Sequence, residues 1–474
     1  MLKGEGATPV RLRGKALDRL VRIAQKNRET LQPALAKMEQ ARRLCDLVPA
    51  VLVVVRSLGV LLVEDELGRR AQTRVDWPMC PDCGAKLESR GRVRRAIWTL
   101  LGLITWCRKV GRCPNGCKVG HVAPMEAFLG LSPRQKTCVS VQAPACLLAL
   151  FIPYEIAARI LCALTGVEVS GDAIWAWVQD AAGRVRDKPE PTKSTTDLVV
   201  EEDPRPAEIE RLPLMIGADG VMVPFRPTAG TPKGRTDWQE CKVGVLARLA
   251  ERVGKAGRRI QVLRQRRVAA VRGDVEQFEP RLWSEALRQG LRSAQNVAWI
   301  SDGSPWLWNL LKRFRDQCPQ IVAILDFYHA SQNLWKGVEK CFTGDLRAAK
   351  QYFEDARHRL RHGTPAEVIE GLQAALTLPD LSEEAKKLLS NAYEYLLGHK
   401  DHMDYAILKK LGIPIGSGFV ESACKWLIQQ RFKCVGMRWS EQGFDNLLSL
   451  RVAWVNGRFD QLFSHYEDPL PCAA

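Results

Sequence analysis

The chain has 474 residues, a hydrophobic content of 46% and a formal net charge of +17, with a pI near 9.3. This length exceeds one ordinary core and predicts two to four globular domains, while the cationic excess predicts a polyanionic partner, nucleic acid first and an anionic membrane a distant second. The 15 cysteines are scattered behind a charged N-terminus, which argues against a small secreted disulfide scaffold and favours a reducing cytoplasm.

Residues 1–75 are predicted to form a basic helical region. Its cations either lie along DNA phosphates or form a solvated helix face, and the sequence leaves both interpretations open. They are Arg11, Arg13, Lys15, Arg19, Arg22, Lys26 and Arg28. An apolar run from Leu47 is interrupted by Pro49 and Arg56, and a second one, residues 145–154, is too short to span a bilayer. Both are expected to be core segments of a soluble protein that has no membrane partner.

Residues 76–125 are predicted to form a zinc ribbon, because the cysteine pairs of CPDC and CPNGC flank a hairpin-like segment. Four thiolates at tetrahedral positions hold a structural Zn²⁺ and replace a core too small to stand alone, and they leave no open position for catalysis. The ligands are Cys80, Cys83, Cys113 and Cys117. The second pair has three intervening residues instead of the commoner two, so Cys107 or His121 is an alternative ligand.

Residues 126–183 are predicted to be a helix-turn-helix-like DNA-binding region. Gly166 is expected to end the first helix, and Ser170 or Asp172 to cap the second, whose exposed start suits a major groove. Any helical hairpin resembles this pattern, so a purely structural pair of helices is the alternative. Residues 184–212 are charged and proline-rich, and they are expected to be a linker.

Residues 213–335 and 411–460 are predicted to form one α/β domain. Its apolar runs predict the order strand, strand, strand, helix, strand, helix, strand, with a meander followed by parallel neighbours. That order is the ribonuclease H-like arrangement. Residues 336–410 are expected to be a helical insertion, and residues 461–474 a C-terminal tail.

Three carboxylates from distant positions are predicted to meet in this domain. Asp219 lies in the first strand, Asp302 ends the fourth, and Glu421 begins a helix after a glycine-rich loop. Phosphodiester cleavage must activate an oxygen nucleophile and neutralise the leaving oxygen, and two Mg²⁺ (or Mn²⁺) ions on carboxylate ligands do both. The sequence therefore predicts a catalytic metal site. Taken alone, Glu421 also fits a helix N-terminal acid favoured by the macrodipole.

Asp326 is an alternative second acid, because it too ends an apolar strand, QIVAILDFYH, which also carries His329. In the structural interpretation Asp326 and His329 form a hydrogen-bonded pair that supports the site from its edge. In the functional interpretation His329 contacts the scissile phosphate or the attacking water.

Several motifs resemble the DDE transposases of ISKra-type bacterial insertion sequences and, more distantly, Mutator-like transposases. They are IGADGVMVPF, WQECKVG, ISDGSPWLW, LDFYHA and GSGFVESACKWLIQQRFKCVGMRW, and the resemblance covers about residues 75–460. It implies a ribonuclease H-like core with a helical insertion behind a zinc-ribbon and helical DNA-binding region, and the triad Asp219, Asp302 and Glu421. It favours Asp302 over Asp326, because in the Mutator-like pattern the second acid precedes a helix and a histidine-bearing strand comes after. It also implies a bacterial, nucleoid-associated protein of the cytoplasm.

Cationic and aromatic residues at and behind the Glu421 helix are expected to grip a DNA end. They are Lys425, Arg431, Lys433, Arg438 and Trp439. Trp439 is expected to stack on an unpaired base, and Lys425 either meets a phosphate or pairs with Glu421 one helical turn away.

These expectations describe a DNA transposase. It would bind the terminal inverted repeats of an insertion sequence, nick DNA to free 3′-hydroxyls and join them to target DNA, as a homodimer or larger assembly on DNA. The alternatives are a ribonuclease H-like structure-selective nuclease and a catalytically silent DNA-binding regulator.

Overall fold

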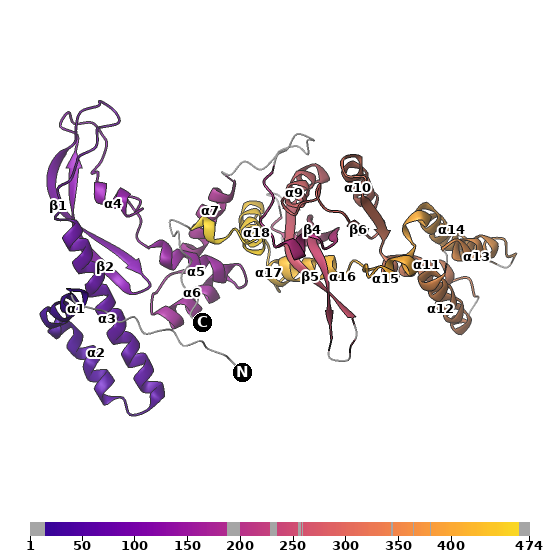
Figure 1. Cartoon of the computed structure of the whole chain (residues 1–474), viewed down its shortest axis with the longest axis horizontal. Coiled ribbons are helices and arrows are strands. Elements are labelled where there is room, and N and C mark those ends of the chain that lie inside the picture. The colour runs from indigo at the N-terminus through magenta and orange to yellow at the C-terminus, as the bar shows by residue number, and fades with distance from the viewer. Residues whose placement is uncertain are drawn as a thin grey trace. The chain divides into compact units, whose positions relative to one another are not determined.

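The computed structural model describes residues 15–186, 200–227, 235–254, 257, 259–342, 345–363, 365–379 and 381–463 (Figure 1). The predictions for Arg11 and Arg13, for the middle of the linker and for most of the C-terminal tail lie outside these residues. The chain forms two compact units, Met1–Ala181 with Asp460–Ala474, and Ala182–Phe459.

The first unit opens with three helices, α1 (Lys15–Lys26), α2 (Arg28–Gln40) and α3 (Leu44–Arg70), so the helical prediction is confirmed where the structure describes it. Arg19 of α1 donates to Asp65 and Glu66 of α3. At least one of the predicted cations therefore holds two helices together instead of standing free for DNA.

The prediction that the apolar run from Leu47 is core is wrong. No residue of α3 is buried, and Leu44 and Val55 are 74% and 56% exposed. Apolar side chains occur all around this helix, so neighbours on one side leave the others uncovered. Among the described residues, α3 is the one helix long and apolar enough to cross a membrane, a criterion of length and composition only. The second run forms the end of α5 (Val139–Ala149) and the turn after it, and Ala145, Cys146 and Ala149 are buried as predicted.

A two-stranded hairpin and a helical pair complete the first unit. Strands β1 (Glu88–Thr99) and β2 (Gly102–Arg112) pair antiparallel, and the short helix α4 (Pro124–Phe128) follows them. The pair consists of α6 (Tyr154–Thr165) and α7 (Gly171–Arg186), whose last residues pass into the second unit. Gly166 ends α6 with φ 69°, and the Ser170 hydroxyl accepts the N–H of Ala173 at 3.1 Å. The predicted helix stop and cap are confirmed.

The second unit is built on a five-stranded mixed sheet in the order β5-β4-β3-β6-β7. The strands are β3 (Leu214–Phe225), β4 (Asp237–Val253), β5 (Arg259–Arg272), β6 (Val297–Ser301) and β7 (Ile321–Leu325). The first three pair antiparallel, whereas β3–β6 and β6–β7 are parallel. The predicted meander and the predicted crossover strands are therefore confirmed. A short helix, α8 (Ala207–Glu210), precedes the sheet.

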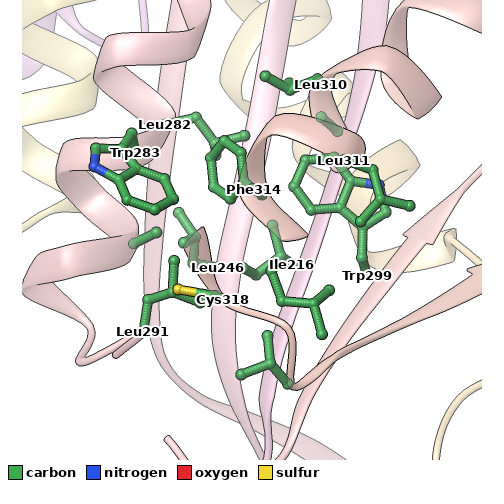
Figure 2. Close-up of a cluster of buried hydrophobic side chains, with 14 of the residues drawn as sticks. Ile216, Leu246, Leu282, Trp283, Leu291, Trp299, Leu310, Leu311, Phe314 and Cys318 are labelled. Carbon is green, nitrogen blue, oxygen red and sulfur yellow. The ribbon is translucent and has the colours of Figure 1, made fainter. Parts of the chain in front are cut away.

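One face of the sheet packs against α9 (Val275–Arg288) and α10 (Pro305–Gln317). In Figure 2 the aromatic rings of this core meet edge to face, with Phe314 4.7 Å from Trp283 and 5.2 Å from Trp299 between ring centres. Buried apolar side chains from strands and helices make this a continuous hydrophobic layer, which fixes the sheet as a rigid base.

The other face packs against the helices that follow β7, and a second buried cluster joins Met215, Ile300 and Ile324 of the sheet to those helices. The helices are α11 (Phe327–Val338), α12 (Leu346–His362), α13 (Pro365–Ala375), α14 (Glu383–Gly398) and α15 (Tyr405–Lys410), with a 3-10 turn at Lys400–His402. The helical prediction for residues 336–410 is confirmed where the structure describes them, and that range begins inside α11. His329 lies on α11 and not on a strand, which corrects the prediction, because Asp326 already starts the helix.

The chain returns to the sheet through one broken helix. It comprises α16 (Gly418–Ala423), a π-helical segment (Cys424–Gln429) and α17 (Gln430–Phe432), and α18 (Glu441–Val455) follows. A 3-10 turn at Asp460–Leu462 is the last described element.

Candidate functional site

Three aspartates lie at the same level of three neighbouring strands. Gly217 pairs with Ile300 across β3 and β6, and two residues further on stand Asp219 and Asp302. Ser301 pairs with Leu325 across β6 and β7, so Asp302 is level with Asp326. Side chains alternate along strands, and this register therefore puts all three carboxylates on the face that carries the second core.

Asp302 is held by the turn that leads into α10. Its carboxylate accepts the N–H of Ser304 at 2.9 Å and the Ser304 hydroxyl at 2.8 Å. Gly303 between them has φ 89°, and a Cβ there would stand 2.5 Å from the hydroxyl oxygen of Tyr395. That hydroxyl donates to the backbone carbonyl of Asp302 at 2.7 Å. A residue of the helical insertion therefore holds the chain in place just after β6, at Asp302.

Glu421 comes to this face because α16 approaches the sheet at a glycine. A Cβ on Gly217 would stand 2.6 Å from Val420 and 2.8 Å from Phe419. Val420 is buried, whereas Glu421, the next residue, is exposed. Gly217 precedes Asp219 by two residues, so the helix that carries the third acid packs directly beside the first.

The electrostatics reflect a concentration of negative charge. Burial raises the pKa of Asp219, and the charges of Asp302 and Glu421 raise it further, against lowering by the Gly220 N–H and by His329. Burial, with Asp219 and Glu421, raises the pKa of Cys424 to about 12. The effects of Asp302 and Glu421 on Asp219 require these carboxylates to lie near one another.

The donor set is suited to a hard cation. Carboxylate oxygens are the ligands that Mg²⁺ and Mn²⁺ take in proteins. Among the described residues, the group of candidate ligand atoms that lie within 4.8 Å of one another is the cysteine cluster below, and the three acids are not part of it. The three carboxylates are therefore not drawn together tightly. Their like charges repel at closer range, and a cation would offset that repulsion.

Asp326 differs from the other two aspartates in its surroundings. It is fully buried, and one oxygen accepts the N–H groups of Tyr328 at 2.6 Å and His329 at 3.0 Å. The other oxygen accepts the N–H and the hydroxyl of Ser417. Four donors occupy the carboxylate, which makes Asp326 a poor metal ligand. The hydrogen bond to His329 uses its backbone, so the predicted side-chain pair is corrected.

Of the predicted DNA-binding residues, three are exposed, one is half-buried and one is buried. Lys425, Lys433 and Arg438 are exposed, and no ion pair joins the described side chains of Lys425 and Glu421. Arg431 is 2% exposed and lies 5.1 Å from the Trp439 ring centre, so this buried cation packs in the fold. Trp439 is half-buried and donates its indole N–H to the Phe432 carbonyl at 3.0 Å. The expectation of a surface contact is corrected for the buried Arg431, whereas base stacking by Trp439 stays a prediction.

The four predicted zinc ligands come together in the first unit. The ligand atoms of Cys80, Cys83, Cys113 and Cys117 all lie within 4.8 Å of one another, and this group can hold a structural metal such as zinc. Cys107, the alternative, is exposed on β2 and outside the group. His121, the second alternative, is also outside it.

Left-handed glycines shape both cysteine knuckles. Gly84 (φ 69°) donates its N–H to the Cys80 carbonyl, and Gly116 (φ 74°) donates its N–H to the Cys113 carbonyl. The extra residue of the second knuckle is thus taken up in a tight turn. The Ala85 N–H, followed by the thiols of Cys113 and Cys117, lowers the pKa of Cys83 to about 7 by donating to its sulfur, which favours the thiolate that binds metal.

Sequence reasoning missed the supporting residues Tyr395 and Ser417. Each reaches its aspartate from a distant part of the chain, 93 and 91 residues away. Ser304 carried a readable signal, because an Asp-Gly-Ser run before a helical pattern predicts an Asp side chain that binds the backbone two residues on.

Comparisons with known proteins add little. No family model matches the sequence, and no curated protein matches it. A chain from the Drosophila P element transposase strand transfer complex is similar at 9% sequence identity, over 72% of this chain and 83% of its own, with a TM-score of 0.26. A likeness of that size carries no conclusion about fold or function.

Proposed function

We propose that this protein is a DNA transposase that cuts and joins DNA by metal-assisted polynucleotidyl transfer. The observation that carries the proposal is the register of β3 and β6, which makes Asp219 and Asp302 neighbours on the face where α16 brings Glu421. Three convergent carboxylates in a chain of net charge +17 fit a site that acts on a phosphodiester backbone.

We further propose that the second unit is a ribonuclease H-like domain of the DDE type, and the motif resemblance to ISKra-type transposases supports it. Three antiparallel strands followed by two parallel ones are the topology expected of such a domain. The helices α11 to α15 are its insertion, delivered before the helix of Glu421.

Asp219, Asp302 and Glu421 are the residues that would hold Mg²⁺ or Mn²⁺. The bound ions would activate the attacking oxygen and neutralise charge on the leaving oxygen. Ser304 and Tyr395 keep Asp302 in place through its side chain and its carbonyl. His329, which lowers the pKa of Asp219 from nearby, is suited to contact the scissile phosphate. Lys425, Lys433 and Arg438 are the candidate contacts to the DNA end.

The first unit is proposed to recognise the transposon ends. The cysteine cluster would hold a structural Zn²⁺, and α7 offers the exposed Asp172 and Trp175 near its start for a groove of DNA. Pairing two ends requires at least two copies, so we expect self-association on DNA, in the bacterial cytoplasm.

The test is incubation of the purified protein with Mg²⁺ and a duplex that carries the DNA bordering its own coding sequence. We expect nicks that free 3′-hydroxyls at the ends, and joined products when target DNA is added. Asp302→Asn is expected to abolish both, whereas Asp316→Asn, a change at an exposed position on α10, is the matched control and should leave both intact.

The outcomes separate the alternatives. Cuts at branched DNA without joined products would identify a structure-selective nuclease. Specific binding without any cut, in the wild type as in Asp302→Asn, would identify a silent DNA-binding regulator. Undiminished cutting by Asp302→Asn would remove Asp302 from the site.

A further inference from the structure

A groove runs between α11 and α12, beside the acidic site. It encloses about 690 Å³, within the range of small-molecule sites. Its α11 side is formed by Tyr328, Ser331, Gln332, Trp335 and Lys336, and its α12 side by Lys350, Phe353, Glu354 and Arg357. On each helix these residues recur at intervals of three and four, so each helix presents one face to the groove.

The groove combines aromatic rings with positive charge. Trp335 and Phe353 meet edge to face at 5.3 Å between ring centres, and the Tyr328 side chain is 54% exposed. The acid Glu354 is already paired with Arg357 at 3.2 Å. Lys336 and Lys350 are exposed, and neither makes an ion pair with any residue that the structure describes. Rings for a planar base and unpaired ammonium groups for a phosphate are the two components of a nucleotide site.

The groove is joined to the acidic site through the first turn of α11. Tyr328 and His329 are consecutive, and Asp326 accepts the N–H of both. The Tyr328 ring borders the groove and also lies against the glycine loop, since a Cβ on Gly416 would stand 2.7 Å from it. His329, the next residue, acts electrostatically on Asp219. From Tyr328 to Trp335 the helix rises about 10 Å, roughly three nucleotide steps along a DNA strand.

We propose that this groove binds an unpaired nucleotide of the DNA strand that is being processed. The base stacks on Tyr328 and Trp335, and Lys336 and Lys350 meet the flanking phosphates. The assignment rests on the proposed action on DNA, and it adds a strand-distorting site that is joined to the acidic site by the first turn of α11.

The first test is binding of a fluorescent single-stranded oligothymidylate to the full chain, by anisotropy, without added Mg²⁺ so that no cutting intervenes. An oligonucleotide of equal length without bases carries the same phosphates and separates stacking from charge. Tyr328→Ala is expected to weaken binding of the thymidylate roughly 5- to 150-fold, the range found for loss of one stacked base, and to change binding of the abasic strand little. Tyr328→Phe keeps the ring and should restore affinity.

The contribution of positive charge is tested with Lys350→Glu. The matched control is Lys387→Glu, a change at an exposed position on α14. Lys350→Glu should weaken both oligonucleotides, and Lys387→Glu neither. A second measurement avoids variants altogether, because 5-iododeoxyuridine in the strand cross-links on irradiation to the aromatic ring it contacts. Peptide mapping is expected to place the cross-link at Tyr328 or Trp335.

Cross-links elsewhere, or unchanged thymidylate binding by Tyr328→Ala, would overturn the proposal. Displacement by free thymidine monophosphate at equal base concentration would assign the groove to a free nucleotide and overturn the strand assignment. The proposed function fails separately, if Mg²⁺ supports no cutting or joining. A protein that cuts and joins DNA while the groove variant binds normally would refute the groove alone.

Discussion

The buried carboxylate of Asp326 accepts both the backbone N–H and the hydroxyl of Ser417. Ser417 is the residue before α16, whose first turn carries Glu421, and the other oxygen of Asp326 caps α11. One side chain thus fixes the starts of two helices that enclose the helical insertion between them. Asp326 is a positioning residue for the site, and its loss has different consequences from the loss of Asp302.

Asp326→Asn is expected to lower the free energy of unfolding by about 1–3 kcal/mol for each donor left unpaired, because an amide has one oxygen to accept and places an NH₂ group against donors. Asp302→Asn should cost much less stability, since the asparagine oxygen can still accept the Ser304 N–H in the same turn. Urea unfolding followed by tryptophan fluorescence checks the difference. If both variants lose DNA cutting but Asp326→Asn is as stable as the wild type, Asp326 has a direct role in the chemistry.

Gly217→Ala is expected to separate α16 from the sheet. The new methyl group would meet Val420 at 2.6 Å, and overpacking of this kind costs about 1–3 kcal/mol. DNA cutting should fall by more than the loss of folded protein explains, because Glu421 moves with the helix. Gly183→Ala, where nothing lies within 4 Å, is the control and should be neutral or stabilising. Equal activity of the two variants per folded molecule would contradict the close-contact argument.

The cysteine cluster predicts one zinc ion per chain. Cys113→Ser should lose that zinc and destabilise the first unit, because the metal replaces a core around a few side chains such as Leu87 and Trp77. Cys107→Ser, at an exposed position outside the cluster, should keep it. Metal analysis after dialysis, with circular dichroism, gives the answer. Retention of zinc by Cys113→Ser together with its loss from Cys107→Ser would reinstate the alternative ligand.

Two histidines predict an acid-sensitive contact between the insertion and α10. Trp308 stacks on His399 and His402 at 4.7 and 4.6 Å between ring centres. Burial, followed by the charge of His402, lowers the pKa of His399; burial, then Arg315, lowers the pKa of His402, against a raising effect of Asp401. Tyr395 contacts His399 edge to face.

A depressed pKa in the folded state means that the neutral histidines favour folding above the ordinary value of 6.5, and that this contribution is lost as the pH falls. The free energy of unfolding should therefore decline from about pH 6.5 towards about pH 5, and less so in the His399→Gln/His402→Gln variant. Urea titrations across that range measure both slopes. Parallel curves for the two proteins would show that the pair does not carry the effect.

The order of strands and the positions of Asp219 and Asp302 were predictable from the sequence, because each lies in or just after an apolar run of strand length. The role of Asp326 was not, since it depends on a serine 91 residues away. Arg431 was misplaced at the DNA surface for a related reason. Which side of a helix is covered depends on the elements that pack on it. Arg431 packs on Trp439, and Trp439 is held by the end of β3, which is remote in sequence. The sequence also did not show which elements would pack on α3, so its exposed apolar residues were predicted to be core.

The tie between Asp326 and Ser417 also sets when the site can form during folding. The strands that carry Asp219 and Asp302 both precede the insertion in the chain and can pair before it is made. Glu421 joins them only after the contact between Asp326 and Ser417 has closed a loop of 91 residues. Closing such a loop costs entropy that the insertion must first offset by its own packing. A partly folded chain therefore holds two acids without the third, so the proposed cutting activity should require the fully folded second unit.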